Sequence, residues 1–248
     1  AAKERMWGAV RGTDVAVAPA ADPSIVGAAR RSGARVVTFG ADGSADYRVE
    51  HGVLVGPRGR ICEVGEMWRS MPHDVTNSLA AAALVVESGL VPTESVGAAL
   101  ASFVPAGHRI EFVGEFAGSC WFDDSKATSP HAALTAIRSF DRLVLIAGGR
   151  NKGLDLGQMA SEPGRMSAVV AIGDDAPAIE AAFRGVCPVV TAGSMEEAVR
   201  EAARLAGKGV PVVLSPGCTS YDWYRNYNER GDDFQRRVRE HFGEEDRR

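Results

Sequence analysis

The sequence predicts an α/β protein with a mostly parallel sheet. Short apolar runs alternate with helical segments along the chain, which is typical of a sheet covered by helices on both faces. Of the 248 residues, 45% are hydrophobic and 24% are charged, as in an average globular protein. The segment 104–107 reads Val-Pro-Ala-Gly, in which the proline favours an extended backbone before it and the glycine allows the chain to turn. We therefore expect a domain boundary there, between 1–104 and 105–248.

The first part reads as a small βαβ unit, a meander and two helices. Apolar runs at 15–17 and 36–39 predict buried strands. The helix between them has a capping residue in Asp22, a proline at its first position in Pro23 and a terminating glycine in Gly33. Interrupted alternation predicts an antiparallel meander over 45–64. Two helices are expected at 77–87 and 93–103.

The second part alternates strand and helix regularly. A hairpin is expected around Ala117-Gly118, and three apolar residues, Phe234, Val238 and Phe242, mark one face of a C-terminal helix. The remaining strands are expected at 143–147, 168–172, 189–191 and 210–214. The remaining helices are expected at 131–140, 177–183 and 195–205.

Composition excludes several classes of protein. The formal net charge is −4, which argues against a nucleic-acid-binding surface. No apolar run approaches the ~18–20 residues that a membrane-spanning helix needs. The four cysteines show no metal-binding spacing, so we expect reduced thiols in a cytoplasmic protein.

Polar and charged residues gather after three predicted strands, where parallel sheets bind ligands. The segment 121–129 holds two Asp, a Lys and several hydroxyls, which suits a nucleotide phosphate with Mg²⁺. Helix capping by Ser125 or Thr128 is the simpler alternative. The segment 148–153 opens on two glycines, which let a backbone turn sharply and approach a ligand closely, or which belong to an ordinary loop. The segment 215–231 combines small polar residues with aromatic rings.

Phosphate-binding loops do not occur in this sequence. It has no GxxxxGK[ST] and no GxGxxG pattern, and Ala-Gly-Lys-Gly at 206–209 precedes a predicted strand. Cys218 is not expected to be a nucleophile, because no His lies near it in the sequence.

Several motifs, in order, resemble the Mur ligases of peptidoglycan synthesis, and most of all their D-glutamate-adding branch. They are Ala-Ala-Lys at 1–3, HDVTN at 73–77, HR at 108–109, DDSKAT at 123–128, GG at 148–149 with Lys152, and SPGCTS at 215–220 followed by Asn226-Tyr227 and Arg230-Gly231. The resemblance covers the whole chain but only the later part of the family's architecture. It implies that 1–104 is the back portion of the central ATPase domain and that 105–248 is the Rossmann-like C-terminal domain, in a fragment without the phosphate loop.

The resemblance also implies a chemistry. A substrate carboxylate attacks the γ-phosphate of ATP to give an acyl phosphate, and an amine then displaces phosphate to form an amide. The substrates are UDP-N-acetylmuramoyl-L-alanine and D-glutamate, with ATP and Mg²⁺, and the protein is expected to be a monomer without nucleic-acid or membrane partners. The fragment alone is expected to be inactive.

Site residues follow from the same resemblance. The nucleotide-binding positions are Asn77, Asp74, Arg109 and Asp124. The D-glutamate-binding positions are Thr128, Lys152, Ser220 and Tyr227. The catalytic positions are Lys126, at the acyl phosphate, and Lys3, which holds Mg²⁺ once carbamylated.

The sequence departs from the family pattern at a few positions. Asp74 stands where Asn is usual, which puts an adenine contact in doubt, and Tyr227 replaces Phe. Gly217 and Thr219 replace Ala. Two alternatives stay open: a sister amide ligase acting on folate or on another muropeptide, against which the Ser220 and Tyr227 block argues, and a non-catalytic small-molecule binding module, which the missing phosphate loop favours.

Overall fold

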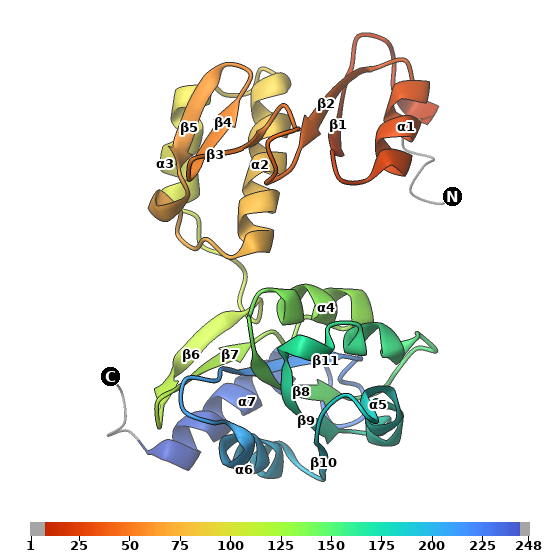
Figure 1. Cartoon of the computed structure of the whole chain (residues 1–248), viewed down its shortest axis with the longest axis vertical. Helices are drawn as coiled ribbons and strands as arrows, with labels where there is room; N and C mark the ends of the chain where they lie inside the picture. The colour runs from red at the N-terminus through yellow and green to blue at the C-terminus, as the bar shows by residue number, and fades with distance from the viewer. Residues whose placement is uncertain (1–7, 244–248) are drawn as a thin grey trace. The chain divides into compact units, whose positions relative to one another are not determined.

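The computed structural model describes residues 8–243 of the chain, which divides into two compact units (Figure 1). The first is Ala1–Val104 and the second is Pro105–Arg248. Each has its own hydrophobic core. Among the described residues, no helix has both the length and the apolar character that a membrane crossing requires.

The first unit begins with the predicted βαβ arrangement. Strands β1 (Val15–Pro19) and β2 (Arg35–Phe39) pair in parallel, and helix α1 (Pro23–Arg31) connects them. The Asp22 carboxylate accepts hydrogen bonds from the backbone N–H groups of Ser24 (3.0 Å) and Ile25 (3.2 Å). The predicted cap is therefore confirmed, and it fixes where α1 begins.

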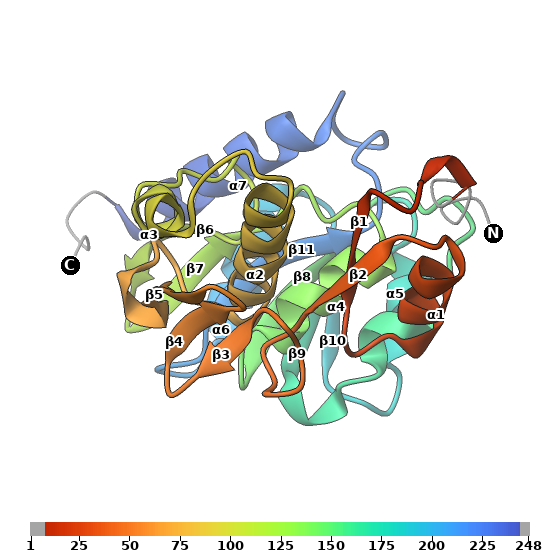
Figure 2. The ribbon, with the colours of Figure 1, turned by 90° about the horizontal axis from the view of Figure 1, so that it is seen from above.

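A three-stranded antiparallel meander and two helices complete the first unit (Figure 2). The strands are β3 (Arg48–Glu50), β4 (Val53–Gly56) and β5 (Gly59–Glu63), a short 3₁₀ helix η2 (Val64–Glu66) follows, and the helices are α2 (Pro72–Glu87) and α3 (Thr93–Ala101). The prediction for α2 was wrong at its start, because the helix begins at Pro72 and not at residue 77. Proline suits a first helical position, where its missing N–H costs no hydrogen bond.

The second unit contains a six-stranded sheet with the strand order β10-β9-β8-β11-β7-β6. All neighbours pair in parallel except β6 and β7, which form the predicted hairpin. Its two turn residues, Ala117 (φ 50°) and Gly118 (φ 76°), are left-handed, as a two-residue hairpin turn requires. The strands are β6 (Glu111–Phe116), β7 (Ser119–Asp123), β8 (Leu143–Gly148), β9 (Met166–Ile172), β10 (Val189–Ala192) and β11 (Val212–Gly217).

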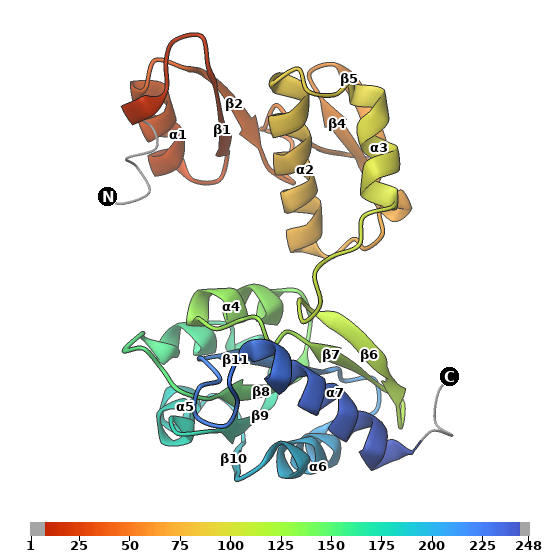
Figure 3. The same cartoon turned by 180° about the vertical axis from the view of Figure 1, so that it is seen from behind.

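Helices cover both faces of this sheet, which confirms the predicted α/β class (Figure 3). One face packs against α6 (Met195–Leu205) and α7 (Tyr227–Phe242). The other packs against α4 (Pro130–Arg138), α5 (Ala176–Phe183) and the 3₁₀ helix η3 (Leu156–Ala160), and a short η4 (Pro163–Arg165) precedes β9. Strands β8 and β11 are buried along their whole length, as central strands of such a sheet must be.

The chain leaves the neighbouring strands β8 and β11 toward opposite faces of the sheet. After β8 the chain passes over the α4 and α5 face to β9, whereas after β11 it passes to α7 on the opposite face. In open α/β sheets, ligands bind near the carboxyl ends of two neighbouring strands whose continuations part in this way.

Candidate functional site

The loops after β7, β8 and β11 meet at one edge of the sheet. Arg150 and Thr219 exchange backbone hydrogen bonds of 2.9 and 3.0 Å, which tie the β8 loop to the β11 loop. The backbone N–H of Asp124 donates to the carbonyl of Leu214 (2.7 Å), and that of Gly217 donates to the carbonyl of Ala127 (2.9 Å). The three polar segments recognised in the sequence are therefore neighbours.

The β7 loop is held by buried acidic residues. Asp124 lies at its start, where one carboxylate oxygen accepts a hydrogen bond from the Ser215 hydroxyl (2.7 Å). Asp123 is fully buried, and its oxygens accept from the Ser125 backbone N–H (2.9 Å) and from the Gln235 side-chain amide (2.9 Å). Neither predicted cap, Ser125 or Thr128, caps α4; Ser129 does so, through its hydroxyl.

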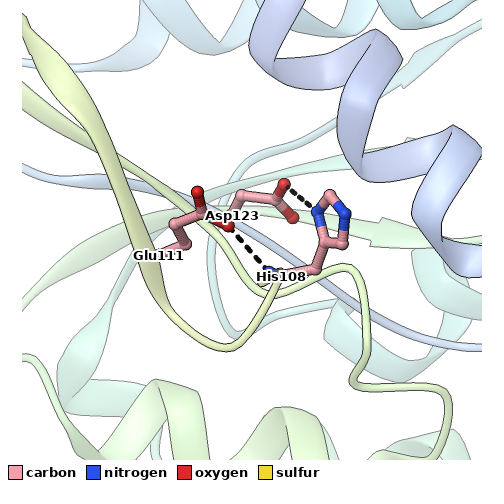
Figure 4. A group of neighbouring side chains, drawn as sticks. All are labelled: His108, Glu111 and Asp123. Atoms are coloured by element: carbon pink, nitrogen blue, oxygen red, sulfur yellow. Dashed lines mark hydrogen bonds and ion pairs between the residues drawn. The ribbon is translucent and has the colours of Figure 1, made fainter. Parts of the chain in front are cut away.

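A His–Glu–Asp cluster lies beside this loop (Figure 4). His108 Nδ1 lies 2.7 Å from Asp123 Oδ2, and the His108 backbone N–H donates to the Glu111 carboxylate (2.8 Å). The hydrogen bond with Asp123 raises the pKa of the His108 imidazole, although burial opposes it. The three side chains could offer ligand atoms within 4.8 Å of one another, but these hydrogen bonds already engage all three. They account for the cluster without a metal.

The predicted nucleotide residue Arg109 lies in a strained turn. Its neighbours His108 (φ 60°) and Ile110 (φ 47°) are both left-handed, a conformation rare for any residue but glycine and least tolerated by β-branched ones. The Lys126 backbone N–H donates to the carbonyl of His108 (3.2 Å) and helps to hold the turn. Arg109 itself is exposed.

Lys126 and Tyr227 are brought together from segments far apart in the sequence. Lys126 Nζ donates to the Tyr227 hydroxyl (3.0 Å) and lies 4.9 Å from the centre of its ring. Both side chains are half-buried. Tyr227 is the first residue of α7, whose start is fixed by the Asn226 side chain, which accepts from the backbone N–H of Glu229 (3.0 Å). The predicted catalytic lysine thus contacts one of the predicted D-glutamate residues.

The other predicted D-glutamate residues lie in the same three loops. Ser220 is buried, and its carbonyl accepts from the Tyr224 backbone N–H (2.8 Å). Thr128 is half-buried, and Lys152 is exposed in the β8 loop. Within residues 8–243, no hydrogen bond joins Thr128, Lys152 or Ser220 to one another.

Gly148 and Gly149 are required by the packing of the chain at the end of β8. A Cβ atom on Gly148 would collide with the carbonyl of Ile172, and one on Gly149 would collide with the carbonyl of Thr219. Both glycines also have φ values (126° and 123°) that disfavour other residues. Neighbouring backbone therefore fills the space that a side chain would need at either position.

The predicted adenine-contacting residues lie in the first unit, on the first two turns of α2. Arg69 binds both carboxylate oxygens of Asp74, at 2.6 and 3.0 Å, and Asp74 is buried. Burial acts to raise the pKa of the Asp74 carboxyl, but hydrogen bonds from His73 and Arg69 outweigh it and lower that pKa. Asn77 is exposed. Lys3, the predicted magnesium residue, lies outside the described residues.

Sequence reasoning missed the role of buried residues that hold this site. Arg230 is 1% exposed, although the sequence only marked it as part of a motif. Charged residues are seldom fully buried, so periodicity alone gave no signal for it. Cys218 is also buried, and burial raises the pKa of its thiol to about 12, so the reactive thiolate is not formed near neutral pH.

The second unit contains a Mur ligase C-terminal domain, since residues 108–218 match the family described as "Mur ligase, glutamate ligase domain". This confirms the resemblance that the motifs indicated. More specifically, the chain is similar to UDP-N-acetylmuramoylalanine–D-glutamate ligases. It is 37% identical to that of Anaeromyxobacter dehalogenans over 258 residues, which covers 97% of this chain and 56% of that protein. It is 40% identical to that of Frankia casuarinae over 216 residues, which covers 83% of this chain and 46% of that protein.

Solved structures share the fold. A murein peptide ligase from Psychrobacter arcticus matches with a TM-score of 0.60 and 17% identity, over 98% of this chain and 54% of that one. A folylpolyglutamate synthase from Mycobacterium tuberculosis matches with a TM-score of 0.61 and 18% identity, over 94% of this chain and 56% of that one. The chain spans about half the length of the relatives it matches.

Proposed function

We propose that this chain carries the amino-acid-binding part of an ATP-dependent ligase that adds D-glutamate to UDP-N-acetylmuramoyl-L-alanine in the cytoplasm. The observation that carries the proposal is the contact between Lys126 and Tyr227, which joins the DDSKAT loop to α7 at the carboxyl edge of the sheet. Support also comes from relatives of that activity at 36–40% identity, whereas the folylpolyglutamate synthase is 18% identical.

The chemistry of D-glutamate suits the side chains at this edge. The ligand brings two carboxylates and one amine. Lys152 supplies an exposed cation on the β8 loop, and the hydroxyls of Thr128 and Ser220 supply neutral donors on the β7 and β11 loops. A carboxylate bound by one cation and several neutral donors is well satisfied. Tyr227 would close the pocket with its ring.

In this proposal, Lys126 lies at the reacting centre. A cation near the transferring phosphoryl group offsets the charge that develops there. Its ammonium donates a hydrogen bond to Tyr227, a residue of the proposed amino-acid pocket, so Lys126 would border both sites. The amine of D-glutamate would then meet the activated carboxyl group where Lys126 holds it.

Some of the predicted nucleotide-binding residues suit that role, and one does not. Arg109 is exposed on its strained turn, where it could bind phosphate oxygens, and Asp124 lies next in the chain to Asp123 at the end of β7, where it could accept from a ribose hydroxyl. Asp74 does not fit a free adenine contact, because Arg69 occupies both of its oxygens. Lys3 stays the proposed magnesium residue, because a carbamate on its side chain would supply oxygen ligands for Mg²⁺.

Direct binding tests the proposal. We expect D-glutamate to bind the 248-residue chain in isothermal titration calorimetry, and L-glutamate to bind much more weakly. Lys152→Ala removes a hydrogen bond to a charged group, worth about 1.5–3 kcal/mol, so its Kd for D-glutamate should rise roughly ten- to a hundred-fold.

Lys208→Ala is the matched control. This exposed lysine precedes β11 and therefore lies at the opposite edge of the sheet from the carboxyl ends. Its removal should leave the Kd unchanged. Equal affinities of the Lys152→Ala variant and the wild type would show that the pocket is assigned to the wrong residues.

A further inference from the structure

Arg230 is a buried guanidinium at the centre of the site loops. It extends from α7 and is 1% exposed. Its Nε donates to the Ser125 hydroxyl (3.0 Å), and its Nη2 donates to the carbonyls of Ser125 (2.9 Å) and Cys218 (3.1 Å). The Ser125 hydroxyl in turn donates to the carbonyl of Tyr227 (2.7 Å). One side chain thus links three segments that are distant in the sequence.

All of these acceptors are neutral, which is unusual for a buried cation. Among the described residues, no carboxylate lies within ion-pair distance of Arg230 and Nη1 has no hydrogen-bond partner, although the carboxylates of Asp222 and Asp123 stabilise the charge from further away. Burial lowers the pKa of the guanidinium to about 10, which still leaves it charged near neutral pH. Burying an unpaired charge is costly. The role of the guanidinium at this position therefore lies in its hydrogen bonds to the loops and not in an ion pair.

The fork of the guanidinium matches the geometry of the loops. Ser125 follows β7 and immediately precedes Lys126, and Cys218 follows β11 two residues before Ser220. A Cβ atom on Gly149, in the β8 loop, would lie 3.1 Å from Nη1, so the guanidinium also reaches the end of β8. The planar, rigid array of donors spans several acceptors at once, which a lysine ammonium on a flexible stem does not do.

We propose that Arg230 is a positioning residue, whose guanidinium fork fixes the β7 and β11 loops relative to each other and so sets the spacing of Lys126 and Ser220. This inference rests on the proposed function, because those two residues belong to the proposed site. Arg230 itself touches neither the substrate nor the nucleotide in this account. It acts through the carbonyls that carry the site residues.

Amide hydrogen exchange of the 248-residue chain tests the proposal without any ligand. The reporters are backbone hydrogen bonds between the loops, donated by Asp124, Gly217 and Thr219. In a folded Arg230→Gln variant, these amides should exchange ~tenfold faster or more, whereas the amide of Val169 inside the sheet should not change. A general loss of stability would instead speed all amides of the unit alike and would overturn the proposal, as would unchanged loop amides.

Three further variants make the test specific. Arg230→Lys keeps the charge but loses the fork, so it should behave like Arg230→Gln; wild-type exchange in this variant would show that charge alone matters. Arg236→Gln, an exposed arginine on the same helix, is the control and should change nothing. If both Arg230 variants fail to fold, Ser125→Ala decides, because it removes only the hydroxyl. Faster exchange at Gly217 and Thr219 would then support the proposal, and unchanged exchange would overturn it.

Binding of D-glutamate to the same variants separates this proposal from the proposed function. If the wild type binds D-glutamate, Arg230→Gln should raise the Kd at least ~tenfold, although Arg230 lies outside the pocket. If the wild type binds none, the proposed pocket fails, and the exchange experiment still decides whether Arg230 positions the loops.

Discussion

Replacing His108 by asparagine should lower the free energy of unfolding of the second unit. The 2.7 Å hydrogen bond from the His108 imidazole to the fully buried Asp123 carboxylate would be lost. Asparagine tolerates the left-handed backbone at this position, so strain should not change much. A hydrogen bond to a charged group contributes about 1.5–3 kcal/mol. Because Ser125 and Gln235 still donate to Asp123, the lower part of that range, about 1.5–2 kcal/mol, is expected.

The effect should depend on pH with a defined sign. The hydrogen bond with Asp123, helped by the nearby carboxylates of Asp232 and Glu111, raises the pKa of folded His108 above its unfolded value. A raised pKa means that the protonated imidazole stabilises the fold. That stabilisation is fully present below the unfolded pKa of about 6.5 and is lost as the pH rises through the folded pKa. The difference in stability between wild type and variant should therefore be larger at about pH 6 than at about pH 8.5.

Differential scanning calorimetry across this range measures the difference. At about 2–4 °C for each kcal/mol, the variant should unfold about 3–8 °C below the wild type at about pH 6. His131→Asn, at an exposed position of α4, is the control and should follow the wild type at every pH. A difference that stays constant or grows as the pH rises would refute the assigned role of the His108–Asp123 pair.

Three further outcomes are expected. Gly149→Ala should lower the free energy of unfolding by more than about 2 kcal/mol, because the added methyl group meets the carbonyl of Thr219. Gly153→Ala, which has open space around it, should lower it by only about 1 kcal/mol. Equal losses of stability in urea unfolding would contradict the packing role of Gly149. Asp74→Asn should weaken the pair with Arg69 and lower stability by about 1–2 kcal/mol in the same assay, and an unchanged midpoint would argue against it. The 248-residue chain, which lacks a GxxxxGK[ST] motif, should release no phosphate from ATP with both substrates present, and a rate on the order of 1–10 s⁻¹ would contradict this.

The sequence by itself determined the elements whose signals are local. Asp22 followed by Pro23 marked the start of α1, and Ala117-Gly118 marked the hairpin turn, because a cap or a turn involves only residues a few positions apart. Helix α2 begins at Pro72, before the predicted start at residue 77, because a proline fits the first position of a helix. The convergence of the three polar loops also followed from the sequence, since the carboxyl ends of parallel strands share one edge.

Tertiary structure alone decided how those loops are held. The bond of Arg230 to Ser125 and that of His108 to Asp123 join residues on different elements, and Gly149 meets a carbonyl from another strand. Such contacts depend on the order of the strands in the sheet and on which side chains fit between neighbouring elements. No local pattern in the sequence encodes the strand order or that fit. The motifs could identify Lys126 and Tyr227 as site residues, but only the folded chain brings the ammonium of one to the hydroxyl of the other, because hydrogen bonds act over a few ångströms in space and not along the sequence.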